Sequence, residues 1–466
     1  KIEGVGASLA EKIEELLKTG HLRYYDRLKK KMPVKITELR AVEGLGPKNI
    51  QTLYKKLGVR TLKELERAAR AGKIRSVTGF GEKTEENILK SIAFLKKTGG
   101  RFLLSEALPL AREIERRLAR LPQVTKVIIA GSVRRRKETI GDLDYLIISR
   151  KPAPVMDFFT AMPEVAQVLA RGQTKSAVRF KNGLEIDLRV VPEDAYGAAL
   201  NYFTGSKEHN VALRQRAIDR GYKLNEYGLF SAKGGSASGG KGVKRIAGRT
   251  EEEIYEALGL GYIEPEMREM TGELEAAEKD RLPHLIGYGD LKGDLQVQTD
   301  WTDGAHSIAE MARAATAAGL EYIVITDHTK RLAMTGGLDE KKILKQMKEI
   351  DALNHKLQIK NHKFRILKGT ECDILKNGDL DLPDAILAQL DVVGVSVHSY
   401  FNLSRQEQTE RIKKAMANPH VDIIFHPTGR ILHKRPPYEV DMEELIKTAK
   451  ETGTVMEIDA YPDRLD

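Results

Sequence analysis

The chain has 466 residues, of which 41% are hydrophobic and 31% charged, so it is too long for one ordinary domain and can bury several cores. Residues 1–290 hold 53 basic against 39 acidic side chains, and residues 291–466 hold 24 against 28, so we expect the front part to bind a polyanion such as nucleic acid. A single cysteine, Cys372, excludes an intrachain disulfide framework, and the lack of a long apolar run or a signal pattern argues against membrane and secretory classes, which predicts a cytoplasmic protein.

Three segments near the N-terminus share an apolar-x-Gly-apolar-Gly core that opens an amphipathic helix, and they begin at Ile2, Val42 and Val77. This is the pattern of a helix-hairpin-helix. Paired glycines permit a tight turn, and the next helix directs free backbone N–H groups at a phosphate. One such pair is often only a helix C-cap, but three copies favour sequence-independent binding of DNA by the turn residues Gly4, Gly6, Gly44, Gly46, Gly79 and Gly81.

Four further regions follow the hairpin region, which we place at residues 1–100. Residues 101–192 contain a long amphipathic helix and then short β-branched runs, which predicts a small mixed α/β domain. Residues 193–263 return to helices and turns around a flexible AKGGSASGGKG tip, and the acidic stretch 264–290 is expected to be a connector. In residues 291–466 strands alternate with helices, which predicts a parallel α/β barrel or a doubly wound sheet.

The second region carries three carboxylates in a chemically informative arrangement. Asp142 and Asp144 begin a strand and lie two residues apart, so both project from one face, and Asp187 belongs to a later strand, EIDLRVV. Converging carboxylates repel one another unless divalent cations lie between them, and two Mg²⁺ ions are what in-line phosphoryl transfer uses. The residues expected to hold the phosphate oxygens precede Asp142, and they are Gly131, Ser132 and Arg135.

An isolated Asp-x-Asp is more often part of a solvent-exposed strand edge or turn. The surrounding sequence therefore decides whether this one is catalytic. GSVRRRKETIGDLD with EIDLRVV, and then YFTGSKEHNVALRQRAIDRGYKLNEYGLF, resemble the nucleotidyltransferase core of a family X DNA polymerase. With its C-terminal module, nearly the whole chain is similar to a bacterial polymerase of that family that carries a polymerase-and-histidinol-phosphatase (PHP) domain. Poly(A) and tRNA-end nucleotidyltransferases also have GS and DxD motifs, but they would not need three hairpins.

The resemblance implies roles for individual residues. Asp142, Asp144 and Asp187 would be the catalytic residues of a nucleotidyltransferase palm and would bind two Mg²⁺ or Mn²⁺ ions. The other nucleotide contacts that it implies are Tyr202, Phe203, Gly205, Asn210 and Arg214, in addition to Gly131, Ser132 and Arg135. It assigns to the DNA-contacting segment of a closing subdomain the residues Asn225, Glu226 and Tyr227. The implied partners are dNTPs and gapped or primer-template DNA, bound by a monomer at the bacterial nucleoid.

The first hairpin raises the question of a second activity. Lys12 aligns with the lysine that in this family forms a Schiff base with an abasic-site sugar and releases 5′-deoxyribose phosphate. A lysine needs a depressed pKa for that chemistry, and most lysines on such a helix only bind phosphate. Lyase activity is therefore a weaker expectation than polymerase activity.

In the C-terminal module, five potential metal ligands follow strands at their carboxyl ends, which is where α/β barrels keep active sites. Histidines and carboxylates so arranged suit Mn²⁺ or Zn²⁺ sites that hydrolyse phosphate esters. In the PHP family these positions bind a metal cluster, which in bacterial family X polymerases supports a 3′–5′ exonuclease. The five residues are Asp303, His328, Glu371, His398 and His426.

This module departs from the family pattern in two places. Gln296 and Gln298 stand where the family has a His pair, and an amide oxygen is a much poorer ligand than imidazole. The closing Asp-x-His pair is not found before Asp466, and the chain opens at Lys1 without an initiator Met, which predicts a fragment at both ends. We therefore expect the barrel to be incomplete and the exonuclease to be impaired.

The combined prediction is a multidomain α/β protein with a helix-hairpin-helix region, a palm with a mixed sheet and an incomplete (β/α) PHP barrel. Its expected function is template-directed DNA synthesis that fills short gaps in base excision repair or end joining. Two other functional classes fit the sequence less well. A noncatalytic DNA-binding scaffold would have no need of three mutually repelling carboxylates, and a phosphoesterase that uses the front half only to deliver DNA is disfavoured by the two glutamines.

Overall fold

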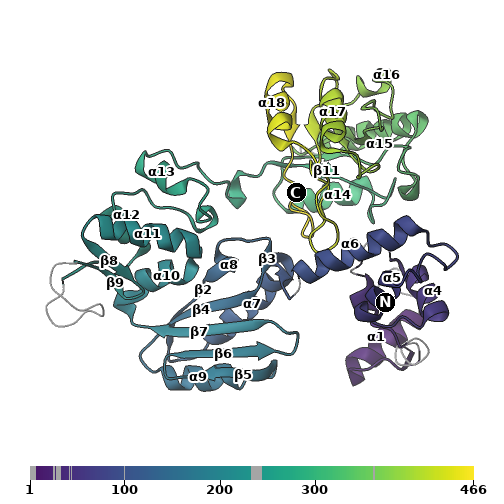
Figure 1. The fold of residues 1–466 in the computed structure, drawn as a ribbon. Helices are drawn as coiled ribbons and strands as arrows, with labels where there is room; N and C mark the ends of the chain where they lie inside the picture. Colours follow the sequence, from purple (N-terminus) through teal and green to yellow (C-terminus); the bar gives the residue numbers. More distant parts are fainter. Residues whose placement is uncertain are drawn as a thin grey trace.

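The computed structural model describes residues 7–24, 27, 33–40, 42, 45–98, 100–231, 244–359 and 363–466. The predicted turn residues Gly4, Gly6 and Gly44 lie outside the described residues, and so does the glycine-rich tip after Ser231. Figure 1 shows four bodies along the chain: the hairpin region, the palm, a closing subdomain and the C-terminal module. Within the described part of the chain, no helix is long and apolar enough to cross a membrane.

The described part of the hairpin region is built from helices and the turns between them. Its helices are α1 (Ala7–Thr19), α3 (Ile36–Arg40), α4 (Pro47–Leu57), α5 (Leu62–Arg70) and α6 (Glu82–Thr98). As the repeats predict, α4 begins directly after Gly46 and α6 directly after Gly81. Apolar positions of the second and third repeats, such as Ile50 and Ile88, form one core together with Leu39 and Leu65 from outside the repeats. The glycine turns are thereby fixed on a rigid base.

The palm is a five-stranded mixed sheet with two helices on one face. Its elements are β1 (Phe102–Leu103), α7 (Leu104–Ala119), β2 (Val124–Ile129), α8 (Gly131–Arg134), β3 (Thr139–Ile140), β4 (Asp142–Ser149), α9 (Pro152–Thr160), β5 (Val165–Arg171), β6 (Lys175–Phe180) and β7 (Glu185–Val191). The sheet order is β2-β4-β7-β6-β5, and β4 runs parallel to β7 whereas the other neighbours are antiparallel. The expectation of a mixed sheet is confirmed.

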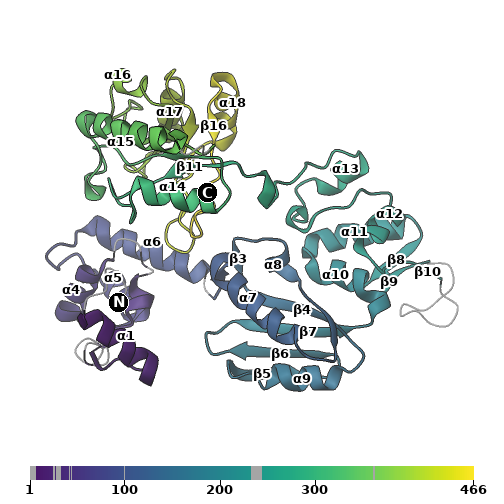
Figure 2. The ribbon, with the colours of Figure 1, turned by 180° about the vertical axis from the view of Figure 1, so that it is seen from behind.

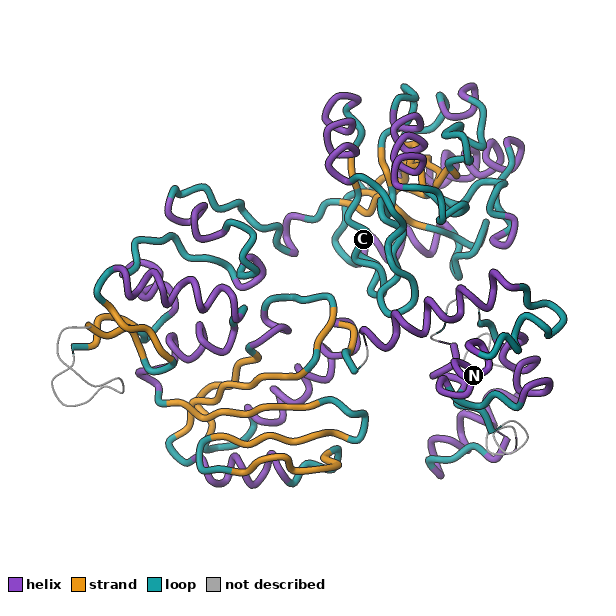
Figure 3. The backbone as a smooth tube through the Cα atoms, viewed as in Figure 1, coloured by secondary structure: helices purple, strands orange, loops and turns teal. Residues whose placement is uncertain are grey.

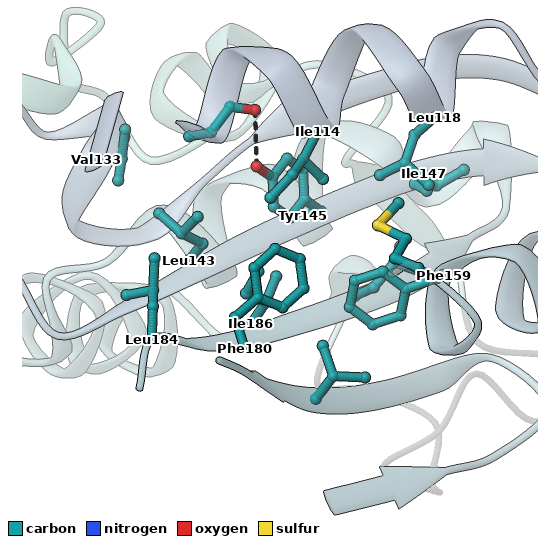
Figure 4. Close-up of a cluster of buried hydrophobic side chains, with 14 of the residues drawn as sticks. Ile114, Leu118, Val133, Leu143, Tyr145, Ile147, Phe159, Phe180, Leu184 and Ile186 are labelled. Atoms are coloured by element: carbon teal, nitrogen blue, oxygen red, sulfur yellow. Dashed lines mark hydrogen bonds between the residues drawn. The ribbon is translucent and has the colours of Figure 1, made fainter. Parts of the chain in front are cut away.

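The palm core decides which way the catalytic face points. Alternate residues of β4 and β7, such as Leu143, Tyr145 and Ile186, pack against α7 and α9 (Figure 4). The Tyr145 hydroxyl donates a hydrogen bond of 2.8 Å to the carbonyl oxygen of Ala111, which satisfies this buried polar group. Because side chains alternate along a strand, the residues between them face the other side of the sheet.

The closing subdomain consists of η1 (Glu193–Ala195), α10 (Tyr196–Thr204), α11 (Lys207–Asp219), β8 (Tyr222–Asn225), β9 (Gly228–Ser231), β10 (Arg245–Ala247), α12 (Glu251–Ala257), η2 (Pro265–Met267) and α13 (Glu273–Glu278). The connector expected at 264–290 is structured over its first part. Leu274, Ala277 and Leu282 pack into the core of this subdomain, and Glu273 accepts a hydrogen bond of 2.8 Å from the His209 ring. The closing subdomain therefore extends over residues 193–282.

The C-terminal module is an open parallel sheet with helices around it (Figures 2 and 3). It contains η3 (Tyr288–Asp290), β11 (Gly293–Val297), α14 (Ile308–Ala317), β12 (Tyr322–Ile325), η4 (Ala333–Thr335), α15 (Glu340–Ile359), β13 (Arg365–Asp373), α16 (Asp384–Leu387), β14 (Val392–Ser396), α17 (Arg405–Met416), β15 (Ile423–Ile424), α18 (Met442–Thr452) and β16 (Val455–Met456). Its six strands pair in chain order, all parallel. This curled half-barrel is the expected incomplete (β/α) barrel. The module touches the palm through Arg430, whose guanidinium lies 2.8 Å from the Glu138 carboxylate.

Candidate active sites

The three predicted palm carboxylates lie on the face of the sheet opposite α7 and α9. Asp144 of β4 stands in register with Asp187 of β7, and Asp142 stands in register with Glu185. The residues between them, Leu143 and Ile186, are fully buried in the core on the other face. Alternation along two parallel strands therefore brings the carboxylates together at one end of the sheet.

Their mutual repulsion appears in the pKa values. Burial, and then the charges of Asp142 and Asp187, raise the pKa of Asp144 to about 7. Burial and the charge of Asp187 also raise the pKa of Asp142. Carboxylates held this close are poised to take up cations, because a divalent ion between them would remove the repulsion.

The segment before β4 is shaped around Asp144. Gly131 has φ +59°, and a Cβ atom at this position would lie 2.1 Å from Asp144 Oδ2. Ser132, the second residue of α8, has a buried Oγ atom that finds no hydrogen-bond partner among the described residues. A buried hydroxyl without a partner, next to a carboxylate cluster, fits a phosphate oxygen better than it fits the protein interior. The donor set is thus suited to a metal-bound triphosphate.

Sequence reasoning missed one cation of this site. Lys175, at the start of β6, places Nζ 3.1 Å from Asp187 Oδ2. Lys175, Asp144 and Asp187 line one small pocket together with Arg189 and Phe203, and the Arg189 guanidinium lies 4.7 Å from the centre of the Phe203 ring. The only sequence signal for Lys175 is its place one strand away from Asp187, which no motif marks.

The basic run that follows Ser132 is paired with the closing subdomain. Arg134 contacts the Glu251 carboxylate at 2.6 Å, and Arg135 donates from Nε to Glu269 Oε1 at 2.8 Å and also to the Thr204 carbonyl oxygen. The predicted triphosphate contact Arg135 is therefore engaged by a carboxylate in this structure. Its role toward a triphosphate stays a prediction, since a nucleotide would have to share the guanidinium with these partners or replace them.

The predicted nucleotide contacts of the closing subdomain surround the turn between α10 and α11. Tyr202 and Phe203 form an edge-to-face ring pair with centroids 5.0 Å apart, and Gly205 ends α10 with φ +73°. Asn210 donates to the Tyr202 carbonyl oxygen at 2.7 Å, and its own amide oxygen is buried without a partner among the described residues. Arg214, one turn further along α11, is partly exposed.

The remaining predicted DNA contacts and the predicted lyase residue lie at three separate places. Asn225 ends β8, and Glu226 and Tyr227 form the turn to β9, where Tyr227 is 49% exposed. Gly46 and Gly81 precede α4 and α6, and a Cβ atom would meet nothing within 4 Å at either position or at Gly79. The Lys12 ammonium lies 4.6 Å from the centre of the Tyr24 ring. These placements leave their roles as predictions.

The C-terminal module brings all five predicted ligands together around one carboxylate. Glu371, at 1% exposure, contacts three imidazoles: His328 at 3.3 Å, His398 at 3.1 Å and His426 at 2.8 Å. Asp303 contacts the other nitrogen of His328 at 3.5 Å. Ligand atoms of His328, Glu371 and His398 lie within 4.8 Å of one another, a spacing that suits a bound metal ion. The buried Nδ1 atom of His426 is without a hydrogen-bond partner among the described residues, which also fits metal ligation.

The histidines and carboxylates of this cluster shift one another's pKa values. Burial would lower the pKa of His398, but its hydrogen bonds to Asp373 and Glu371 outweigh burial and raise it to about 9. Burial would raise the pKa of Glu371, but hydrogen bonds to His398 and His426 hold it well below its usual range. Asp373 was not predicted, although it lies only two residues beyond Glu371 on β13.

Gln298, one of the two glutamines that replace the family's His pair, also contacts this cluster. Gln298 Nε2 donates a hydrogen bond of 3.0 Å to Glu371 Oε2. The amide therefore takes up an oxygen that a metal ion bound at Glu371 would need. Gln296 lies on β11, where its backbone N–H donates to Asp294.

Family models match three parts of the chain. The model described as "DNA polymerase beta thumb" matches residues 199–269, and the "SAM-like Helix-hairpin-helix tandem" model matches residues 36–93. The model described as "PHP domain" matches residues 294–458.

Curated relatives extend these matches. The chain is 40% identical to the DNA polymerase/3′-5′ exonuclease PolX of Bacillus subtilis over 100% of this chain and 80% of that protein. It is 27% identical to DNA polymerase lambda of Rattus norvegicus over 58% of this chain and 48% of that protein. Its C-terminal part is 36% identical to a protein of Thermoanaerobacter named as a phosphatase, over 36% of this chain and 65% of that protein.

Proposed function

This chain belongs to the family X DNA polymerases that carry a C-terminal PHP domain, and we propose that Asp142, Asp144 and Asp187 hold the metal ions of its nucleotidyl-transfer site. As a member of that family it is a template-directed DNA polymerase that fills short gaps. Family X polymerases and PHP domains both depend on metal ions. We propose Mg²⁺ or Mn²⁺ at the palm and Mn²⁺ or Zn²⁺ at the PHP domain.

The observation that carries the proposal is the register of Asp144 with Asp187, together with the unpartnered Ser132 hydroxyl beside them. Two divalent ions at these carboxylates would lower the pKa of a primer hydroxyl and neutralise a triphosphate. The chain itself orients the groups. Gly131 allows the backbone to approach Asp144 closely, Ser132 donates to a phosphate oxygen, and Lys175 fixes the Asp187 carboxylate.

The hairpins and the closing subdomain supply the DNA contacts in this proposal. The turns that precede α4 and α6 present backbone N–H groups to DNA phosphates without reading the base sequence. The Tyr202 and Phe203 rings lie beside the carboxylate pocket, where they would contact the sugar of a bound dNTP. We propose that the protein acts as a monomer on gapped or primer-template DNA.

Gap filling is tested with one 5′-labelled primer in a duplex that has a single-nucleotide gap, incubated with Mn²⁺ with or without the complementary dNTP. We expect extension by one nucleotide when the dNTP is present and no shortening when it is absent. An intact primer in both reactions would contradict the polymerase assignment. Shortening that persists after Asp187→Ala would show a working nuclease in the PHP domain.

The PHP domain is proposed to bind metal weakly, because the Gln298 amide occupies Glu371 where the family pattern has an imidazole. Restoring the imidazole with Gln298→His should raise Mn²⁺ affinity of the PHP domain about tenfold, the usual effect of one ligand or its supporting group. The measurement is calorimetric titration of Mn²⁺ into the full chain carrying Asp187→Ala, so that palm binding is reduced in every sample.

Gln389→His is the matched control, since it adds a histidine at an exposed position of the same domain. It should leave the titration unchanged. Equal Mn²⁺ affinities for the Gln298→His and Gln389→His proteins would show that the glutamine does not limit metal binding.

A further inference from the structure

A pocket of about 390 Å³ opens on the PHP domain, and residues that line it follow members of the histidine cluster closely in the sequence. That volume is in the range of small-molecule sites. Its lining residues extend the same strand ends that carry candidate ligands, since Arg331 follows His328 by three residues and Tyr400 follows His398 by two. Consecutive Cα atoms are about 3.8 Å apart, so Tyr400 lies within about 8 Å of His398 along the chain. The pocket is lined by Arg331, Leu375, Lys376, Asn377 and Tyr400.

An aromatic ring surrounded by cations forms one wall of this pocket. The Tyr400 side chain is 41% exposed, and Arg331 donates to its hydroxyl at 3.4 Å. Lys376 Nζ lies 5.8 Å from the centre of the ring, and the Arg411 guanidinium lies 5.9 Å from it. An exposed ring between positive charges suits a planar, electron-rich group that carries an anion.

The wall is held from beneath by a buried arginine. Arg411, at 3% exposure, donates to the carbonyl oxygens of Leu375 at 2.7 Å and Ser399 at 2.9 Å, and also to that of Ile374. Its guanidinium thus ties the chain after β13 to the chain after β14, which are the two sides of the pocket. Within the described residues it makes no salt bridge, so its charge adds to the positive field of the pocket.

The two exposed cations of the pocket are also without carboxylate partners. Neighbouring lysines are paired, Lys330 with Glu340 at 2.5 Å and Lys414 with Asp379 at 2.8 Å. In the described part of the chain no such ion pair involves Arg331 or Lys376, and no carboxylate lines the pocket. Hydrogen bonds from Ser404, and then the charge of Lys376, lower the pKa of Glu407. This carboxylate accepts its hydrogen bond from the Ser404 hydroxyl at the start of α17. In a domain with more acidic than basic residues, this is a local site for an anion.

We propose that this pocket binds one nucleotide of a single DNA strand, with its base stacked on Tyr400 and its phosphate at Arg331 and Lys376. Base stacking on an aromatic ring and phosphate contacts to arginine and lysine are how proteins hold single strands without reading sequence. The pocket would hold a strand end close to the histidine cluster. Binding of a single strand at this pocket is a property beyond gap filling, and it requires neither nucleotide addition nor cleavage.

The experiment uses the full chain and an oligo(dT) with 5-iododeoxyuridine at its 3′ end, irradiated in EDTA so that no metal-dependent reaction occurs. Mass spectrometry should find a crosslink in the peptide that contains Tyr400. Tyr400→Leu should reduce that crosslink at least tenfold, and Arg331→Gln or Lys376→Gln should reduce it at least threefold. Tyr461→Leu, which removes a 66% exposed ring elsewhere in the same domain, should leave it unchanged.

Two further readouts make the result decisive. Primer extension by each variant should stay within twofold of the parent chain. A parent chain that extends primers but gives no crosslink at Tyr400 overturns this proposal and not the polymerase assignment. The Lys376→Gln variant changes only an exposed side chain and tests the site even where Tyr400→Leu does not fold. If free dTMP displaces the oligonucleotide at equal nucleotide concentration, the pocket is a site for free nucleotides, and the strand assignment is wrong.

Discussion

Replacing Asp187 with alanine is expected to lower the rate of nucleotide addition at least a thousandfold while DNA affinity stays within about twofold. Asp187 stands in register with Asp144 at the end of the palm sheet, and it belongs to the carboxylate set proposed to hold both metal ions. A thousandfold loss corresponds to about 4 kcal/mol of transition-state stabilisation, which is in the range for loss of charge stabilisation in phosphoryl transfer. Single-turnover extension of the gapped substrate measures it.

The same substitution should not destabilise the palm. Asp187 raises the pKa of both Asp142 and Asp144, so its charge acts against its neighbours in the folded protein. The ion pair that Asp187 loses with Lys175 is exposed to solvent and contributes little, so the melting temperature without metal should stay the same or rise. Asp157→Ala is the control, because it removes an exposed carboxylate of the same domain whose one ion pair among the described residues is with Arg171. Incorporation by Asp187→Ala at the parent rate would overturn the proposed role of this carboxylate.

Much of the fold follows from local patterns. Period-two alternation in DLDYLIIS and EIDLRVV puts Leu143 and Ile186 in the core and turns Asp144 and Asp187 to the other face, which is how the structure has them. The repeated glycines predict where α4 and α6 begin, because a glycine turn followed by an amphipathic run leaves few alternatives. Such features depend only on residues that are close in the sequence.

What the sequence does not disclose depends on contacts between distant segments. Glu269 is 134 residues from Arg135, and nothing in either segment marks the ion pair that they form. Residues after Glu264 have the composition of a connector, yet Leu274 and Ala277 pack into the core of the closing subdomain. Arg411 reads as a solvated helix residue in its own segment, but the carbonyl oxygens of Leu375 and Ser399 draw it into the interior. Tertiary packing overrides local pattern at each of these positions.

Gly131→Ala is expected to reduce nucleotide addition about a hundredfold although it removes no functional group. The new Cβ atom would lie 2.1 Å from Asp144 Oδ2, so the carboxylate or the backbone must move by more than about 1 Å to reach an ordinary contact. A displacement of about 1 Å in a catalytic group costs on the order of 100-fold in rate. Alanine also pays about 1 kcal/mol of backbone strain at φ +59°.

Gly183→Ala separates the two effects of that substitution. Gly183 lies in the turn between β6 and β7 of the same domain with φ +94°, and a Cβ atom there would meet nothing within 4 Å. Both variants should lose a few degrees of melting temperature from backbone strain, but only Gly131→Ala should lose activity. If the two lose activity equally, the close approach of Gly131 to Asp144 has no catalytic importance. If only Gly131→Ala does, the glycine is required because it leaves room for the carboxylate, and the position of Asp144 rather than the stability of the palm sets the rate.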